Sequence, residues 1–147
     1  MRRSAPLAEE LRGDEEPAVP ADRCSAGDGD ACWSAAQVLM RAQGPAQPPG
    51  PDILLLLDRA CQLRNPLACL NLGLASLRGD GGIPQEPALA RALHLRSCEL
   101  GLPVACARSA ALINQGIGGP ADREEAERLL RRACTLGDPG ACEALPR

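Results

Sequence analysis

The chain of 147 residues contains no lysine, phenylalanine or tyrosine, one tryptophan (Trp33) and one histidine (His94). Without lysine it has no phosphate-binding P-loop lysine, no Schiff-base amine and no Ser-x-x-Lys nucleophile. One imidazole cannot build a multi-histidine metal centre, and one aromatic ring cannot form a stacking platform for single-stranded nucleic acid. The missing residue types have AT-rich codons, which indicates a GC-rich genome and predicts a bacterial source.

A strong positive charge and long apolar runs are also absent. The net charge is −3, so we expect neither nucleic acid nor an anionic membrane as a partner. The longest apolar run, residues 53–57, is far too short to span a bilayer, and no apolar segment typical of a secretory signal follows Arg2 and Arg3. The hydrophobic share is 45%, with 25 alanines and 23 leucines, and this composition predicts a globular protein with an aliphatic core.

Eight cysteines stand out in this composition. They form four pairs whose members are eight positions apart, and the pairs recur at intervals of 37, 37 and 36 residues. The cysteines are Cys24, Cys32, Cys61, Cys69, Cys98, Cys106, Cys134 and Cys142. Self-similarity at such a period is typical of repeat proteins, in which each copy is one small unit of secondary structure.

Turn-forming residues separate the two cysteines of a pair. Gly101 and Gly137 suit the left-handed position just after a helix, and Asn65 and Asp138 suit the N-cap of the next one. Proline follows at the first helical position in three copies: Pro66, Pro103 and Pro139. The first cysteine of a pair is therefore predicted in the last turn of one helix, and the second in the first turn of the next.

Across such a tight helical hairpin the two cysteines of a pair face each other. A continuous helix would hold them about 12 Å apart, beyond the roughly 7 Å that a disulfide tolerates between Cα atoms. We therefore predict four local bridges: Cys24–Cys32, Cys61–Cys69, Cys98–Cys106 and Cys134–Cys142. Two alternatives stay open, namely zinc ligation, which usually uses closer spacing, and reduced buried thiols in a cytosolic protein.

Helical periodicity and glycine-rich breaks predict an all-α chain, with no strand-like alternation. The expected helices cover about 30–41, 52–63, 66–78, 87–100, 103–115, 122–136 and 139–145. Small residues four positions after each second cysteine (Ala36, Gly73 and Ala110) allow paired helices to approach closely. A pair of such short helices cannot enclose a core, so the copies must stack into an α-solenoid of about three repeats plus a terminal half-repeat.

Two regions are predicted along the chain. Residues 23–147 form the cysteine-rich repeat domain. Residues 1–22 form an acidic, mostly flexible arm with room for a short helix over 6–11. Pro17 and Pro20 argue against a helix that continues to Cys24.

The second and third copies resemble a known family. The run Ala68-Cys69-x-x-Leu72-Gly73, continued by a Gly-x-Gly turn and ended by Cys98, resembles the Sel-one-like repeat, as does its counterpart from Ala105 to Cys134. The family belongs to the tetratricopeptide-like α-solenoids. The paired cysteines narrow the resemblance to the helicobacter cysteine-rich group, whose repeats each carry one disulfide, and a mitochondrial oxidase-assembly factor is similar in design. The resemblance covers about residues 24–145 and implies that the first helix of each repeat faces the concave side.

The resulting prediction is a non-catalytic, monomeric protein-interaction module that binds a peptide or protein in an extended groove, without cofactor or metal. Positions two and nine after each second cysteine are polar and share a helix face. These six candidate groove residues are Ser34, Arg41, Asn71, Arg78, Arg108 and Gln115. The alternative interpretation of the same pattern is ordinary solvated surface.

Other function classes remain as alternatives. Relatives in the cysteine-rich group are often labelled β-lactamase or penicillin-binding, yet a serine enzyme of that type needs a lysine and a zinc enzyme needs several histidines. Cysteine-dependent metal binding or an assembly-factor role is a further alternative. Disulfides predict an oxidising compartment, periplasmic or secreted, whereas reduced cysteines would fit the cytoplasm.

Three smaller features have competing interpretations. His94 is either a packed residue of the solenoid or a catalytic or ligand residue. Trp33 either anchors a partner or packs against the first disulfide. The last long helix carries Glu-to-Arg pairs four residues apart, which predict a solvated face. The residues of these pairs are Glu124, Glu127, Arg128 and Arg131.

Overall fold

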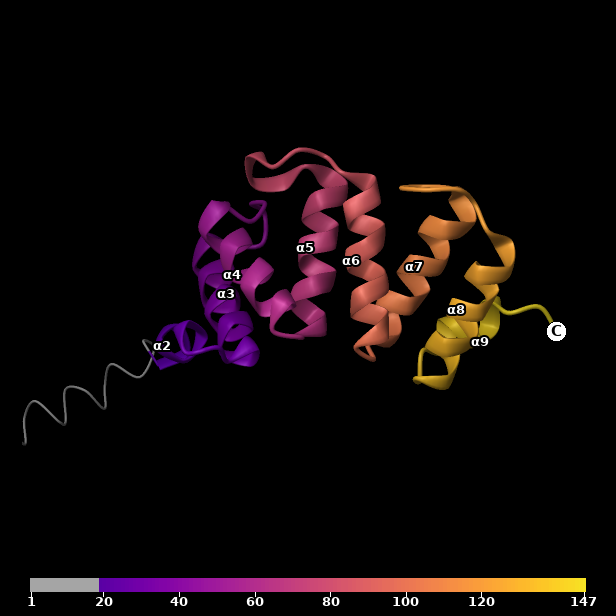
Figure 1. Ribbon diagram of the computed structural model, residues 1–147, viewed down its shortest axis with the longest axis horizontal. Coiled ribbons are helices and arrows are strands. Elements are labelled where there is room, and N and C mark those ends of the chain that lie inside the picture. Colours follow the sequence, from indigo (N-terminus) through magenta and orange to yellow (C-terminus); the bar gives the residue numbers. More distant parts are fainter. Residues whose placement is uncertain (1–18) are drawn as a thin grey trace, which may run out of the picture.

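The computed structural model describes residues 19–147, which contain α-helices, one short 3-10 helix and no strand. The elements are α2 Val19–Ser25, α3 Gly29–Gln43, α4 Pro51–Gln62, α5 Pro66–Arg78, η2 Asp80–Gly82, α6 Pro87–Glu99, α7 Pro103–Gln115, α8 Arg123–Thr135 and α9 Pro139–Ala144. The helices stand in a row, with α2 at one end and α9 at the other (Figure 1). The predicted all-α solenoid is confirmed, and it consists of the pairs α3–α4, α5–α6 and α7–α8 between two single helices.

Helices α5 and α7 begin and end at the predicted residues. Each begins at a proline, whose missing N–H is one that the first helical turn leaves without a partner anyway. Each ends at a glycine in the left-handed region, Gly79 with φ 77° and Gly116 with φ 70°. Such a residue stops the helix and turns the chain back, so local sequence alone sets these boundaries.

Helix α2 corrects the predicted extent of the arm. The arm was expected to reach residue 22, but the chain is helical from Val19 to Ser25. Pro20 is compatible with this helix because it stands in the first turn, where a proline breaks no intrahelical hydrogen bond. The predicted short helix over 6–11 lies outside the described residues.

The core is built from small and aliphatic side chains. One cluster of buried residues extends from α2 to α5 around Ile53 and Leu57, and a second cluster extends from α5 to α9 around Ile113 and Leu129. Ala36 and Ala110, two of the small residues expected at helix contacts, are 0% and 2% exposed. The core has no phenylalanine or tyrosine to fill space between helices. Instead, small side chains at the contacts let the helices pack close together.

The loops between paired helices lie along one edge of the row (Figure 1). They pack against the preceding second helix through glycines. A Cβ on Gly81 would lie 2.5 Å from both Leu54 Cδ1 and the carbonyl oxygen of Pro49, and a Cβ on Gly118 would overlap the carbonyl oxygen of Pro87. Backbone contact of this closeness requires glycine and fixes the spacing between neighbouring repeats.

Candidate interaction surface

Each disulfide joins the end of a second helix to the start of the next first helix. The bonded pairs are Cys24–Cys32, Cys61–Cys69, Cys98–Cys106 and Cys134–Cys142, the same four local pairs that the spacing predicts. The Cα–Cα distances run from 4.5 to 4.7 Å. No free cysteine remains, and between residues 19 and 147 no three His, Cys, Asp or Glu side chains gather into a group able to hold a metal ion.

The turn chemistry inside each bridge follows the prediction, with one exception. The side chain of Asn65 accepts the Ala68 N–H at 3.0 Å, so it caps α5. Three turns use a glycine with strongly positive φ, but the second turn places Arg64 there, at φ 73°. A residue with a Cβ is strained in this region, and the disulfide-closed turn holds it there.

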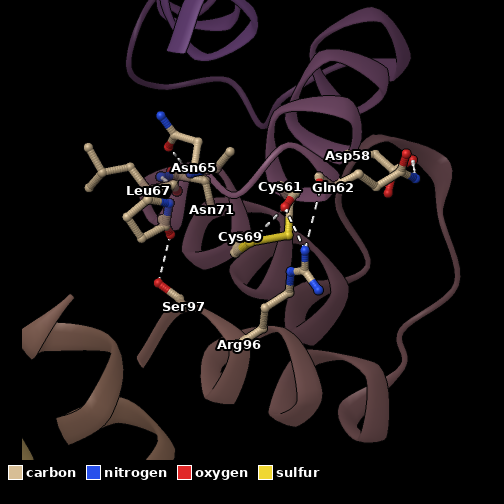
Figure 2. Close-up of a disulfide and its surroundings, with 11 residues drawn as sticks. Asp58, Cys61, Gln62, Asn65, Leu67, Cys69, Asn71, Arg96 and Ser97 are labelled. Atoms are coloured by element: carbon tan, nitrogen blue, oxygen red, sulfur yellow. Dashed lines mark hydrogen bonds between the residues drawn. A yellow bond between two sulfur atoms is a disulfide. The ribbon is translucent and has the colours of Figure 1, made fainter. Parts of the chain in front are cut away.

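An inter-repeat contact that sequence reasoning missed surrounds these turns. Arg96, two positions before Cys98, donates to the carbonyls of Cys61 at 3.3 Å and Gln62 at 3.4 Å, at the end of α4 (Figure 2). In the same way, Arg59 donates hydrogen bonds to backbone carbonyls at the end of α2, and Arg132 donates one to a backbone carbonyl at the end of α6. A cation suits these carbonyls because they carry the negative end of the helix dipole. The recurrence of arginine two positions before three of the first cysteines was the available signal.

His94 is a packed residue, as the first of its two interpretations predicts. It is 1% exposed, and its ring lies so close to Gly73 that a Cβ there would overlap it. Its Nδ1 has no hydrogen-bond partner. Burial, and to a lesser degree the positive charge of Arg108, lower the pKa of His94 to about 4. The only imidazole of the chain is thus neutral and inaccessible at neutral pH.

Trp33 and the charged face of α8 behave as structural features. Trp33 is half-buried and packs against the core cluster that contains the first disulfide. On α8, Glu127 pairs with Arg131 at 3.7 Å, as expected. Arg128, however, pairs with Glu125 at 2.5 Å instead of with Glu124, because the three-residue spacing brings the guanidinium alongside that carboxylate. The hydrogen bonds from Arg128 lower the pKa of Glu125.

The six predicted groove residues stand on the three first helices α3, α5 and α7. Ser34 and Asn71 are half-buried, and the other four are exposed. Asn71 Nδ2 donates to the carbonyl oxygen of Leu67, within its own helix. None of the six lines either of the two cavities of about 460 and 390 Å³ on this surface. We refer to these residues as the polar stripe: Ser34, Arg41, Asn71, Arg78, Arg108 and Gln115.

Three arginines of the polar stripe differ from most others on the surface. Arg41, Arg78 and Arg108 make no hydrogen bond or ion pair within residues 19–147. By contrast, Arg59, Arg96 and Arg132 donate to backbone carbonyls, and the other arginines of α8 pair with carboxylates. The stripe therefore presents positive charge that the described part of the chain does not neutralise.

The two cavities lie away from the polar stripe. One of about 460 Å³ opens between α4, α5 and the beginning of α6, and its lining includes Leu54, Leu55 and Leu72. The other, of about 390 Å³, lies between α7 and α8 beside α9, and includes Ala110 and Leu130. Sequence reasoning missed both, because each depends on how three elements pack together.

No helix within residues 19–147 has the length and apolar character that crossing a membrane requires.

Known proteins resemble this chain in sequence and in fold. The Sel1 repeat family model matches residues 66–102 and 103–138. Cytochrome c oxidase assembly factor 7 of Xenopus tropicalis is 30% identical over 101 residues, a match that covers 67% of this chain. The chain spans only 44% of the length of that relative.

Solved structures share the architecture. A Sel1 repeat protein from Oxalobacter formigenes superimposes with a TM-score of 0.75 at 23% identity, over 86% of this chain and 93% of that one. The Helicobacter pylori cysteine-rich protein B gives a TM-score of 0.69 at 21% identity, over 90% of this chain and 95% of that one. With two tandem family matches inside a solenoid of the same fold, the chain belongs to the Sel1 repeat family.

Proposed function

We propose that this protein is a non-catalytic interaction module whose polar stripe binds an extended, acidic segment of a partner protein. The observation that carries the proposal is the unpaired charge of Arg41, Arg78 and Arg108 on three successive first helices. A carboxylate-rich segment would supply the missing counter-charges, through hydrogen bonds that are stronger when both groups are ionised. The disulfides support this role because they hold the helices in fixed relative positions, which lowers the ordering cost of binding.

The chain offers few side chains that could carry out catalysis or bind a metal ion. The chain has no lysine, its one histidine is buried and neutral, and all of its cysteines are engaged in disulfides. A β-lactamase of the serine type and a thiolate metal carrier would each need groups that are absent or already bonded. An assembly-factor role, suggested by the name of the Xenopus relative, is compatible with the proposal because it too would require binding of a protein client.

The test uses a labelled peptide of alternating Glu and Ser, about twelve residues long, which spans about 40 Å when extended. Replacing Arg78→Ala together with Arg108→Ala should weaken binding about five- to tenfold in fluorescence anisotropy, because two exposed charge contacts are lost. Both side chains are exposed, so the free energy of unfolding should change by no more than about 0.5 kcal/mol.

The matched control removes the same charge from α8 through Arg123→Ala with Arg131→Ala. This variant should bind the peptide as tightly as the wild type. Equal weakening by both double variants would show a general effect of net charge, and unchanged binding by the stripe variant would remove the polar stripe as the site.

A further inference from the structure

The cavity between α4, α5 and α6 is apolar and open, and its walls include two of the most exposed aliphatic side chains of the described chain. Leu55 is 70% exposed and Leu89 is 44% exposed, while Leu54 beneath them is buried. Leu55 keeps most of its apolar surface in water, and Leu89 keeps nearly half, so folding gains only part of the burial free energy that these two side chains could supply. Their placement calls for an explanation other than the stability of the fold.

The next repeat junction provides an internal comparison. One repeat later, Arg91 replaces Leu54, Ala92 replaces Leu55 and Ser109 replaces Leu72. There the side chain of Arg91 crosses toward the loop and donates to the carbonyl oxygen of Pro120 at 3.1 Å. The repeat therefore folds at this position with arginine, alanine and serine in place of the three leucines, so the leucines around the first junction are not required by the architecture.

The charges at the cavity have one sign. Asp58 and Glu86 both line it, and no arginine does. Asp58 accepts a hydrogen bond from Gln62, and neither carboxylate forms an ion pair within residues 19–147. A large apolar side chain flanked by cations would satisfy both features, because it would cover the leucines and neutralise the carboxylates.

We propose that this cavity is a second binding site, which takes one leucine- or phenylalanine-sized side chain next to lysine or arginine on an extended segment of a partner protein. It is separate from the polar stripe. On α5 the cavity is lined by Leu72 and Ser76, which point about 130° away from Asn71 and Arg78 at 100° per residue. The polar stripe would bind an acidic segment and the cavity a basic one, so an experiment can refute either proposal without refuting the other.

The test uses the full chain, with labelled leucine and isoleucine methyl groups, and two capped peptides, Ser-Lys-Phe-Lys-Ser and Ser-Glu-Phe-Glu-Ser. The lysine peptide should produce saturable NMR shifts at Leu54, Leu72 and Ile83, and the glutamate peptide should bind at least about fivefold more weakly. No saturable shift with the lysine peptide, or equal affinity for both peptides, would overturn the proposal.

Matched variants locate the contact. Leu55→Ser should weaken binding of the lysine peptide about tenfold, because Leu55 would lose its contact with the bound side chain. Leu136→Ser, which changes another exposed leucine away from the cavity, should leave the affinity unchanged. Equal loss in both variants would overturn the assignment. Shifts of the cavity methyls with protein concentration alone, abolished by Leu55→Ser, would identify a second copy of the chain as the occupant and contradict the proposal.

Discussion

At the scale of single residues, arginine has two distinct roles on this solenoid. Arg59, Arg96 and Arg132 donate hydrogen bonds to the carbonyl groups at the ends of α2, α4 and α6, so these guanidinium groups already have partners within the fold. Arg78 and Arg108 have no such partner. Sequence reasoning identified the second group by its polar register, but the first group needed the structure, since nothing in a single repeat says which neighbouring carbonyls an arginine reaches.

His94 should make the stability of the protein depend on pH. Its folded-state pKa of about 4 lies below the ordinary 6.5, so the unfolded chain binds a proton more readily than the folded one. The contribution of His94 is therefore complete above pH 6.5 and is lost as the pH falls toward 4, by about 3 kcal/mol in total. Above pH 6.5 the imidazole is neutral in both states, and this dependence should vanish.

The variant His94→Leu, which places there the residue found at the equivalent Leu130, isolates this effect. Urea unfolding followed by circular dichroism should show the variant gaining stability relative to the wild type as the pH is lowered from 7 to about 4.5, because protonation no longer favours unfolding. Carboxylates titrate equally in both proteins and cancel in the difference. Parallel stability curves for the two proteins would contradict this account of His94.

At the scale of elements, helix ends were the most predictable features and contacts between elements the least. The bounds of α5 and α7 follow from a proline and a glycine in the sequence. Helix α2 was missed because Pro20 was interpreted as a break, whereas it stands in the first turn. The packing of each loop onto the preceding helix was also beyond sequence reasoning, because glycine in a loop indicates a turn but not which backbone lies against it.

Two neighbouring glycines test that loop contact. Gly81 and Gly82 both have positive φ, 66° and 80°, so alanine is strained at either position by about 1–2 kcal/mol. Only at Gly81 would the new Cβ meet Leu54 and the carbonyl oxygen of Pro49; at Gly82 nothing lies within 4 Å. Thermal and urea unfolding should show Gly81→Ala to be destabilised more than Gly82→Ala, by about 1–3 kcal/mol. Equal losses would mean that the loop does not pack on α4 as described.

At the scale of the whole molecule, the repeat period and the turn chemistry were enough to predict the architecture. A 37-residue period with paired cysteines leaves few arrangements other than stacked helical hairpins. The candidate sites were less predictable. The polar stripe is on the first helices, as its register indicated, but the apolar cavity depends on α4, α5 and α6 together, and Leu55 in the sequence is indistinguishable from a core leucine.

The central claim is that the disulfides hold this solenoid together. Each closes a loop of about nine residues, for which chain entropy assigns roughly 2.6 kcal/mol. The four together contribute up to about 10 kcal/mol, which is comparable to the whole stability of a typical domain. A core of alanine, leucine and cystine, with no phenylalanine or tyrosine, has little other burial to replace that contribution.

The most direct measurement is helicity by circular dichroism during thermal unfolding, with and without a strong reductant, on protein whose local pairing has been verified by non-reducing peptide mapping. We predict that reduction melts the helices at room temperature or lowers the Tm sharply. Cys142 is exposed, whereas the six cysteines of the first three bridges are at most 3% exposed, so the Cys134–Cys142 bridge should open first. Unchanged helicity and Tm in fully reduced protein would contradict the account.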